Sequence, residues 1–190
     1  MDNFKHYTVM KSEAVDALEC KAGLIYVDCT LGGGGHSELI LKRIKPDGRL
    51  IAFDVDVDAI SAAKKRLSSY SNFYPVNRSY TEIKEVLDEL NINKIQGIIF
   101  DLGASYHQLT SRDRGFSFMK DSPLDMRFNQ SGDLTAYDVV NNYKENELVE
   151  IFSKYGEERF SRRIAKAIVQ NRPINTTLQL SDLIKNSTPR

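Results

Sequence analysis

Short apolar segments alternate with amphipathic segments along the first hundred residues. The apolar segments are rich in β-branched and aromatic residues, and they predict strands over 24–30, 49–56, 72–77 and 94–102. Between them, apolar residues recur three and four positions apart, which predicts helices over 12–18, 36–44, 58–70 and 80–92. Alternating strands and helices joined by tight turns are typical of an α/β protein. We therefore expect a doubly wound sheet of about four parallel strands. Its third strand is placed at an edge, because Pro75 has no N–H to give to a neighbour.

The pattern changes after this alternating region. Residues 103–134 keep neither a helical nor a strand period and mix arginines with aromatic residues, which favours a functional loop over a disordered one. Helical spacing then predicts helices over 135–143, 145–155, 157–170 and 177–186. We expect two domains, an α/β domain over 1–134 and an all-helical segment over 135–190.

Composition narrows the class of protein. The 190 residues carry a formal net charge of zero, with 41% hydrophobic and 27% charged residues, as in ordinary globular domains. No apolar run is long enough to span a bilayer, and the N-terminus has no secretory signal pattern. Cys20 and Cys29 match neither a disulfide framework nor a zinc spacing. We expect a cytoplasmic protein with no metal site and no membrane partner.

The stretch DCTLGGGGHS, residues 28–37, is the first candidate site. Four glycines follow a predicted strand and precede a predicted helix, an arrangement that presents backbone N–H groups and a helix N-terminus to a ligand. Asp54 ends the next strand, twenty residues after Gly34, at the spacing where an acidic side chain commonly binds a ribose. Together they predict a site for a nucleoside-containing cofactor.

The identity of the cofactor follows partly by exclusion. No Gly-Lys-Ser/Thr follows the glycines, so the turn is not a P-loop. The dinucleotide pattern G-x-G-x-x-G also fails, since its last position is Ser37 or Glu38. With no pyrophosphate to bind, S-adenosylmethionine fits better than NAD. A nicotinamide-dependent oxidoreductase and a glycine turn that binds nothing stay open as alternatives. Acidic residues end three predicted strands, at Asp28, Asp54 and Asp101, and would meet at one crevice.

Five longer blocks carry a resemblance to a known family. They are HYTVMKSE (6–13), YVDCTLGGGGHS (26–37), DLGASYHQL (101–109), RGFSFMKDSPLDMR (114–127) and YGEERFSRRIAKAIV (155–169). With these blocks the chain closely resembles the bacterial small-subunit ribosomal RNA methyltransferase H family, which methylates N4 of one cytosine with S-adenosylmethionine. The resemblance implies a Rossmann-like class I methyltransferase sheet with an all-helical insertion.

The resemblance also implies roles for single residues. Gly34, Gly35 and His36 would contact the methionine end of the cofactor, and Asp54 its ribose. Tyr80 matches an aromatic residue that touches the cofactor. Asp101 and Gln108 would close the pocket around the adenine and the reactive end, and Asp101 is the expected catalytic residue, an acceptor for a hydrogen of the cytosine amino group.

A base that reacts in such a pocket must leave its stack. Aromatic and arginine side chains of the long loop suit that task, namely Arg114, Phe116, Phe118 and Arg127. The helix over 157–170 adds a basic face with Arg162, Arg163 and Lys166. The alternatives are a packed connector for the loop and a solvated face for the helix. The expected partner is small-subunit ribosomal RNA in a subunit or an assembly intermediate, and a homodimer stays open.

Two features depart from the family pattern. His107 stands where the family usually has proline, which makes the DLGAS turn less rigid. Family members also continue well past residue 190, so we expect a chain truncated at its C-terminus or covered there by a partner. A catalytically inactive RNA- or ribosome-binding module is the alternative that this second departure favours.

Overall fold

A computed structural model describes residues 8–189 of the chain. Internal contacts divide the protein into two compact units, Met1–His107 and Gln108–Arg190. The boundary lies between His107 and Gln108 and not after residue 134, so the long loop belongs to the helical unit. Each unit is described by itself below.

The first unit is built on a parallel sheet with the strand order β3-β2-β1-β4. Its strands are β1 (Ile25–Asp28), β2 (Arg49–Phe53), β3 (Phe73–Val76) and β4 (Gly97–Ile99). All three pairings are parallel, with Val27 opposite both Ile51 and Ile98. The α/β prediction is confirmed, and so is the edge position of the strand that contains Pro75. The fourth strand is shorter than its apolar run predicted, because only Gly97–Ile99 pair with β1.

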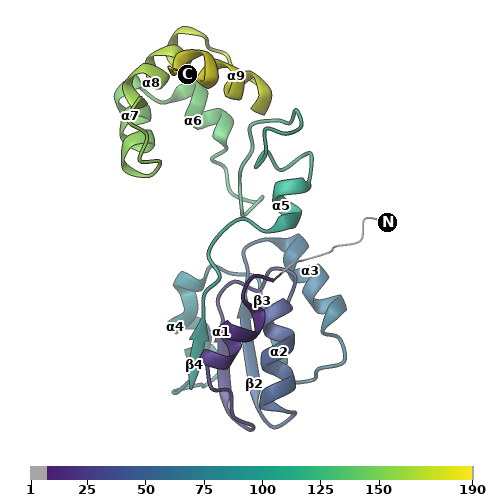
Figure 1. The fold of residues 1–190 in the computed structure, drawn as a ribbon. Helices are drawn as coiled ribbons and strands as arrows, with labels where there is room; N and C mark the ends of the chain where they lie inside the picture. The colour runs from purple at the N-terminus through teal and green to yellow at the C-terminus, as the bar shows by residue number, and fades with distance from the viewer. Residues whose placement is uncertain (1–7, 190) are drawn as a thin grey trace. The chain divides into compact units, whose positions relative to one another are not determined.

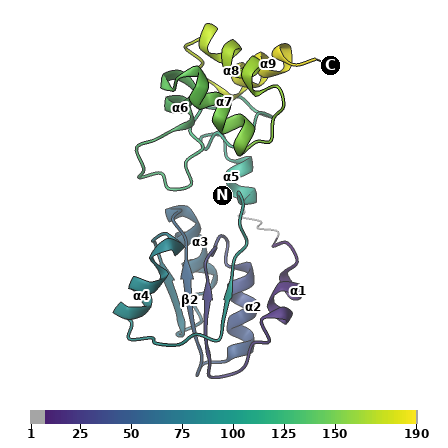
Figure 2. The same ribbon diagram turned by 90° about the vertical axis from the view of Figure 1, so that its left-hand side faces the viewer.

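Helices cover both faces of this sheet, as Figures 1 and 2 show. Helices α2 (Gly35–Ile44) and α3 (Val57–Arg66) lie on one face together with α1 (Lys11–Ala17). The other face carries α4 (Ile83–Glu89), which follows the short 3-10 helix η1 (Tyr80–Glu82). Right-handed crossovers produce this distribution when the chain passes from β1 outward to β3 and then returns to β4.

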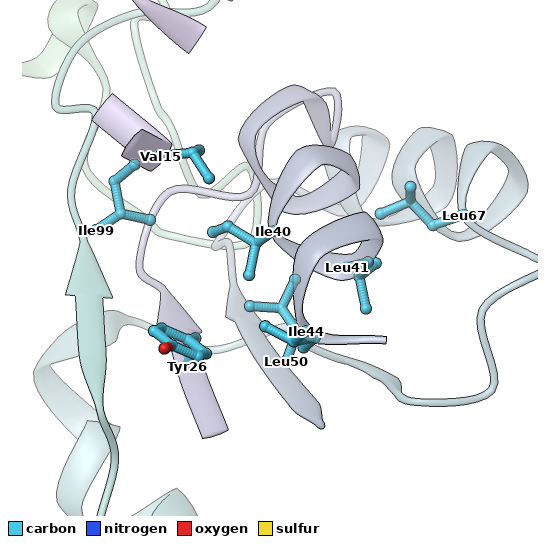
Figure 3. Close-up of a cluster of buried hydrophobic side chains, with 8 residues drawn as sticks. All are labelled: Val15, Tyr26, Ile40, Leu41, Ile44, Leu50, Leu67 and Ile99. Atoms are coloured by element: carbon cyan, nitrogen blue, oxygen red, sulfur yellow. The ribbon is translucent and has the colours of Figure 1, made fainter. Parts of the chain in front are cut away.

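The core on the α2 face fixes that helix against the sheet. Figure 3 shows Ile40, Leu41 and Ile44 of α2 packed towards Leu50 of β2 and Tyr26 of β1, all at most 1% exposed. Full burial of side chains this large contributes about 2 kcal/mol each. The spacing of the three α2 residues aims one helix face inward and leaves Lys42 and Arg43 outward. The first turn of α2 is therefore held rigidly at the carboxyl ends of β1 and β2.

The second unit is helical. It contains α5 (Tyr106–Thr110, which begins in the first unit), α6 (Ala136–Asn142), α7 (Glu145–Lys154), α8 (Ser161–Gln170) and α9 (Thr177–Ser187). Leu148 of α7 and Ile164 and Ile168 of α8 form the centre of its core. The four helices predicted after residue 134 are confirmed, whereas α5 lies in the stretch for which no element was predicted. No described helix is long and apolar enough to cross a membrane.

The long loop packs on this helical core. Leu124 is 3% exposed and belongs to the same apolar cluster as Ile164. Pro123 forms an isolated bridge with Thr176, and the amide of Thr177 donates to the carbonyl of Ser122 at 2.9 Å. These contacts explain why the domain boundary precedes the loop.

Candidate cofactor site

The glycine turn between β1 and α2 has two residues in left-handed backbone conformations. Gly32 has a φ of 48° and Gly34 a φ of 76°, and Gly34 is the N-cap of α2. Side chains with a Cβ adopt these angles less readily, so glycine is favoured at both positions. Gly35 begins the helix, whose first amides have no intrahelical acceptor and point out of its N-terminus.

The end of β1 anchors the turn from inside. Asp28 is fully buried; its Oδ2 accepts from the hydroxyl of Ser37 at 2.7 Å and its Oδ1 from the amide of Thr30 at 3.0 Å. Burial raises the pKa of Asp28, and these two hydrogen bonds lower it in part. The Thr30 hydroxyl in turn accepts from the amide of Asp101 at 2.7 Å, which ties the turn to the end of β4. Asp28 therefore supports the glycine turn from within.

Asp54, directly after β2, closes the other side of the turn. Its Oδ2 accepts from the amide of Gly32 at 2.8 Å, and its Oδ1 accepts from the amide of Asp56 at 2.9 Å. A carboxylate offers about four acceptor positions, so Asp54 retains room for hydroxyl donors of a ligand. Burial raises the pKa of this carboxyl, and the two amides lower it in part.

His36 lies between the turn and Asp101. Its Nδ1 is 3.7 Å from Oδ2 of Asp101, and its side chain is 6% exposed against 45% for Asp101. Its Nε2 is buried and has no hydrogen-bond partner in the described structure. A buried polar atom without a partner is costly, so this nitrogen marks a position where a ligand or water would bind. The structure thus brings Gly34, Gly35, His36, Asp54 and Asp101 together in one unit.

Tyr80 faces an aromatic partner that the sequence analysis did not single out. Its ring meets that of Phe100 edge to face, with centroids 5.5 Å apart and planes at 89°. Both rings are partly exposed, at 39% and 48%. Two such rings at the carboxyl ends of strands suit a flat heterocycle. The sequence alone could have indicated Phe100 as a candidate site residue, since it is an aromatic residue immediately before Asp101.

A cluster of charges holds the turn from outside. Glu38, on the first turn of α2, accepts from Lys42 at 2.8 Å and from Arg66 of α3 at 2.6 Å. Arg66 also donates to the carbonyl of Gly33 at 3.2 Å, so one guanidinium joins the turn to two helices. The hydrogen bond from Lys42, followed by the Arg66 contacts, lowers the pKa of Glu38 to about 2.

Gln108 is the predicted cofactor residue that the first unit does not contain. It is 5% exposed on α5 and opens the second unit, so its place beside the cofactor stays a prediction. The part of the chain that the structure describes holds no group of three or more His, Cys, Asp or Glu side chains able to bind a metal ion.

The two loop arginines that were predicted to bind RNA stabilise the loop itself. Arg114 is 4% exposed and donates to the carbonyls of Arg127 and Phe128 at 3.0 and 3.2 Å. Arg127 pairs with both carboxylate oxygens of Asp125 and donates to the carbonyl of Gly132 at 2.7 Å. These contacts lock the RGFSF and PLDMR blocks into one substructure. An RNA contact by either arginine stays a prediction.

Other predicted RNA contacts are more accessible. Phe116 packs against Phe128 with ring centroids 5.0 Å apart, whereas Phe118 is 57% exposed with Lys185 over its ring. On α8 the exposed cations are Arg162, Arg163 and Lys166. Among residues 8–189 none of these three has a carboxylate within ion-pairing distance.

Comparison with known proteins assigns the family. The sequence matches the MraW methylase family over residues 3–190. The chain belongs to this family. It is 51% identical over 189 residues to a protein named ribosomal RNA small subunit methyltransferase H from Clostridium botulinum (strain 657 / Type Ba4), covering 98% of this chain and 61% of that protein. A protein of the same name from Thermosipho africanus is 50% identical over 185 residues, covering 97% and 63%. The chain thus spans about three fifths of the length of these relatives.

The site of this MraW family member fits a methyl donor that carries a nucleoside. Asp54 retains acceptor capacity for ribose hydroxyls, and the amides at the start of α2 suit a carboxylate. The buried Nε2 of His36 has no partner among residues 8–189. Tyr80 and Phe100 supply aromatic surface for a purine. None of these groups conflicts in charge with S-adenosylmethionine.

Proposed function

We propose that this chain carries the S-adenosylmethionine site of a methyltransferase acting on N4 of a cytosine in small-subunit ribosomal RNA. The observation that supports this most directly is the joining of three strand ends at one glycine turn. At the end of β1, the carboxylate of Asp28 accepts from the hydroxyl of Ser37. At the end of β2, the carboxylate of Asp54 accepts from the amide of Gly32. After β4, the amide of Asp101 donates to the hydroxyl of Thr30. Ligands of open α/β sheets bind at this edge.

The proposed roles follow from position and chemistry. Asp54 binds the ribose hydroxyls, and the first amides of α2 bind the carboxylate of the methionine part. Tyr80 and Phe100 contact the adenine, and Gln108, the first residue of the second unit, stays a predicted cofactor contact. When bound, S-adenosylmethionine would supply a methyl group attached to a sulfonium. The leaving group is the neutral thioether S-adenosylhomocysteine, so the methyl needs no further activation. The protein then has to hold the amine in line with that methyl.

Asp101 is proposed to act on the amine. The N4 lone pair of cytosine is delocalised into the ring, and an acceptor for an N4 hydrogen favours the sp³ geometry needed for attack. The carboxylate of Asp101 is 45% exposed and so is accessible to a substrate base, whereas Asp28 is fully buried. The imidazole of His36, whose Nδ1 lies 3.7 Å from Oδ2 of Asp101, limits the positions that this carboxylate can take.

RNA binding is assigned to the second unit. The exposed cations Arg162, Arg163 and Lys166, which no carboxylate pairs with among the described residues, suit phosphates, and the exposed ring of Phe118 suits stacking on a base. The proposed partner is small-subunit ribosomal RNA in a subunit or assembly intermediate in the cytoplasm. A homodimer is tested separately by sedimentation of the purified chain.

Calorimetric titration tests the cofactor. We expect S-adenosylhomocysteine to bind with micromolar affinity and NADH not to bind; NADH binding without S-adenosylhomocysteine binding would overturn the proposal in favour of an oxidoreductase. Transfer of tritiated methyl groups to small-subunit RNA tests the reaction, with the Clostridium botulinum relative as reference. Binding of both cofactor and RNA without transfer, under conditions where the reference is active, identifies a binding module.

A further inference from the structure

The fourth glycine of the turn owes its identity to a side chain from the N-terminal segment. A Cβ on Gly35 would lie 1.8 Å from Oγ1 of Thr8 and 2.8 Å from its Cβ. Rotation about χ1 of Thr8 moves the hydroxyl but leaves its Cβ in place. Any side chain at position 35 therefore displaces the backbone at Thr8 or the first turn of α2. Gly35 lacks a positive φ, so close approach alone explains this glycine.

A second contact joins the same two segments. Lys11, the first residue of α1, places its Nζ 3.6 Å from Oε2 of Glu38. Thr8 and Lys11 are three residues apart, as are Gly35 and Glu38, so the N-terminal segment follows one turn of α2. Between them Met10 adopts a left-handed conformation with a φ of 46°, which turns the chain into α1. Gly35, His36 and Ser37 are all buried in this arrangement.

We propose that Thr8 is a positioning residue of the cofactor site. Its side chain packs against Cα of Gly35 and holds the first turn of α2 in place. The amides of that turn, and the imidazole of His36, are the groups assigned above to the methionine end of the cofactor. The role proposed for Thr8 is steric, because its side chain limits how closely the first turn of α2 approaches the N-terminal segment. This inference rests on the proposed function, because the affected ligand is S-adenosylmethionine.

The contact predicts an unusual pattern of rescue. Gly35→Ala alone overpacks the contact and weakens S-adenosylhomocysteine binding by about tenfold. Adding Thr8→Gly removes both clashing atoms and restores affinity to within about threefold of wild type. Adding Thr8→Ala removes the hydroxyl but keeps the Cβ at 2.8 Å, so Thr8→Ala/Gly35→Ala stays weak.

Calorimetry of S-adenosylhomocysteine binding and thermal unfolding of these variants test the positioning role of Thr8. Thr81→Gly/Gly35→Ala is the control, since Thr81 lies on η1 and bonds to Ser79, and it stays as weak as Gly35→Ala. Wild-type affinity in Gly35→Ala, or no recovery with Thr8→Gly, overturns the inference. Recovery of melting temperature without any change in affinity among the variants also overturns it, because Thr8 is then merely structural.

The same experiment separates this inference from the proposed function. If Gly35→Ala does not fold, folding of Thr8→Gly/Gly35→Ala but not of Thr8→Ala/Gly35→Ala supports the contact, and the reverse contradicts it. If the wild-type chain itself fails to bind S-adenosylhomocysteine, the proposed function fails, and the positioning role fails with it. The melting temperatures then still report whether Thr8 and Gly35 are in contact.

Discussion

Asp54 accepts a hydrogen bond from the amide of Gly32 at 2.8 Å, which joins the end of β2 to the glycine turn that begins at β1. The carboxylate thus fixes the turn and faces the site at the same time. Its second oxygen accepts from Asp56 in the loop that starts α3. A single substitution at this residue therefore affects both the shape of the turn and the binding of a ribose.

The first prediction concerns the charge of this residue. Asp54→Asn keeps the size of the side chain but removes the charge from its hydrogen bonds, and Asp54→Ala removes them entirely. We expect S-adenosylhomocysteine affinity to fall by about tenfold in Asp54→Asn and further in Asp54→Ala. Calorimetry measures this, with Asp88→Ala on the exposed face of α4 as control. Equal affinities for the Asp54 variants and the control would refute the ribose assignment.

The pH dependence of binding gives an independent prediction. Burial raises the pKa of Asp54 above its ordinary value of 3.8, so this carboxyl takes up its proton earlier than an exposed one as the pH falls. A protonated carboxyl offers less acceptor capacity to ribose hydroxyls. Affinity for S-adenosylhomocysteine should be full at neutral pH and decline as the pH falls through that raised pKa. Titrations between neutral pH and the onset of acid unfolding measure the decline, which Asp54→Asn should abolish.

The charges outside the turn shift the pKa of Glu38 in the opposite direction, downward, and this shift predicts an effect on stability. Hydrogen bonds from Lys42 and Arg66 lower the pKa of Glu38 from 4.5 to about 2. Because the folded pKa is the lower one, the ionised carboxylate stabilises the fold fully above 4.5, and this contribution is lost as the pH falls towards 2. Glu38→Gln should lower the melting temperature at pH 7 and have a much smaller effect near pH 2.5. Asp182→Asn, in an exposed pair on α9, is the control; a pH-independent effect of Glu38→Gln would contradict the assignment.

The elements of the first unit were largely predictable because their signal is local. Apolar runs that end at turn residues mark β1, β2 and β3, and Pro75 marks an edge. The run around Ile98 predicted a longer strand than β4, since strand length also depends on pairing, which a single segment does not reveal. The acidic residues at the strand ends, Asp28, Asp54 and Asp101, were located for the same local reason, and their roles at the cofactor stay predictions.

The remaining features depend on contacts between distant segments. A charged residue in a polar loop is normally exposed, which is why the sequence predicts an RNA contact for Arg114. In the structure its guanidinium is buried and donates to the backbone carbonyls of Arg127 and Phe128. The sequence pattern of side chains does not reveal that backbone carbonyls are the hydrogen-bond partners of an arginine. The contact of Thr8 with Gly35 joins residues 27 positions apart and has no periodic signature either. The short helix α5 was missed because five residues are too few to show a period.

The burial of Arg114 leads to a prediction about stability. Arg114→Ala leaves two loop carbonyls without their donor and should destabilise the second unit by about 1–3 kcal/mol. Thermal unfolding measures this, and Arg112→Ala, an exposed arginine two residues earlier, should have little effect. Unchanged melting of Arg114→Ala together with lost RNA binding would instead support the RNA contact predicted for this residue.

For the cations of α8 we predict an effect on RNA binding and almost none on stability. Arg162, Arg163 and Lys166 are exposed and, within the described residues, unpaired, while Ile164 and Ile168 of the same helix are buried. Replacing the three cations by alanine should leave the melting temperature nearly unchanged, because the core face is intact. Affinity for a small-subunit RNA fragment should fall, and the slope of log affinity against log salt should decrease by about 2, since each lost phosphate contact reduces counterion release. Lys64→Ala/Lys65→Ala/Lys84→Ala removes the same charge from the first unit and serves as control. A similar loss of affinity in both triple variants would show a general charge effect and remove α8 from the RNA interface.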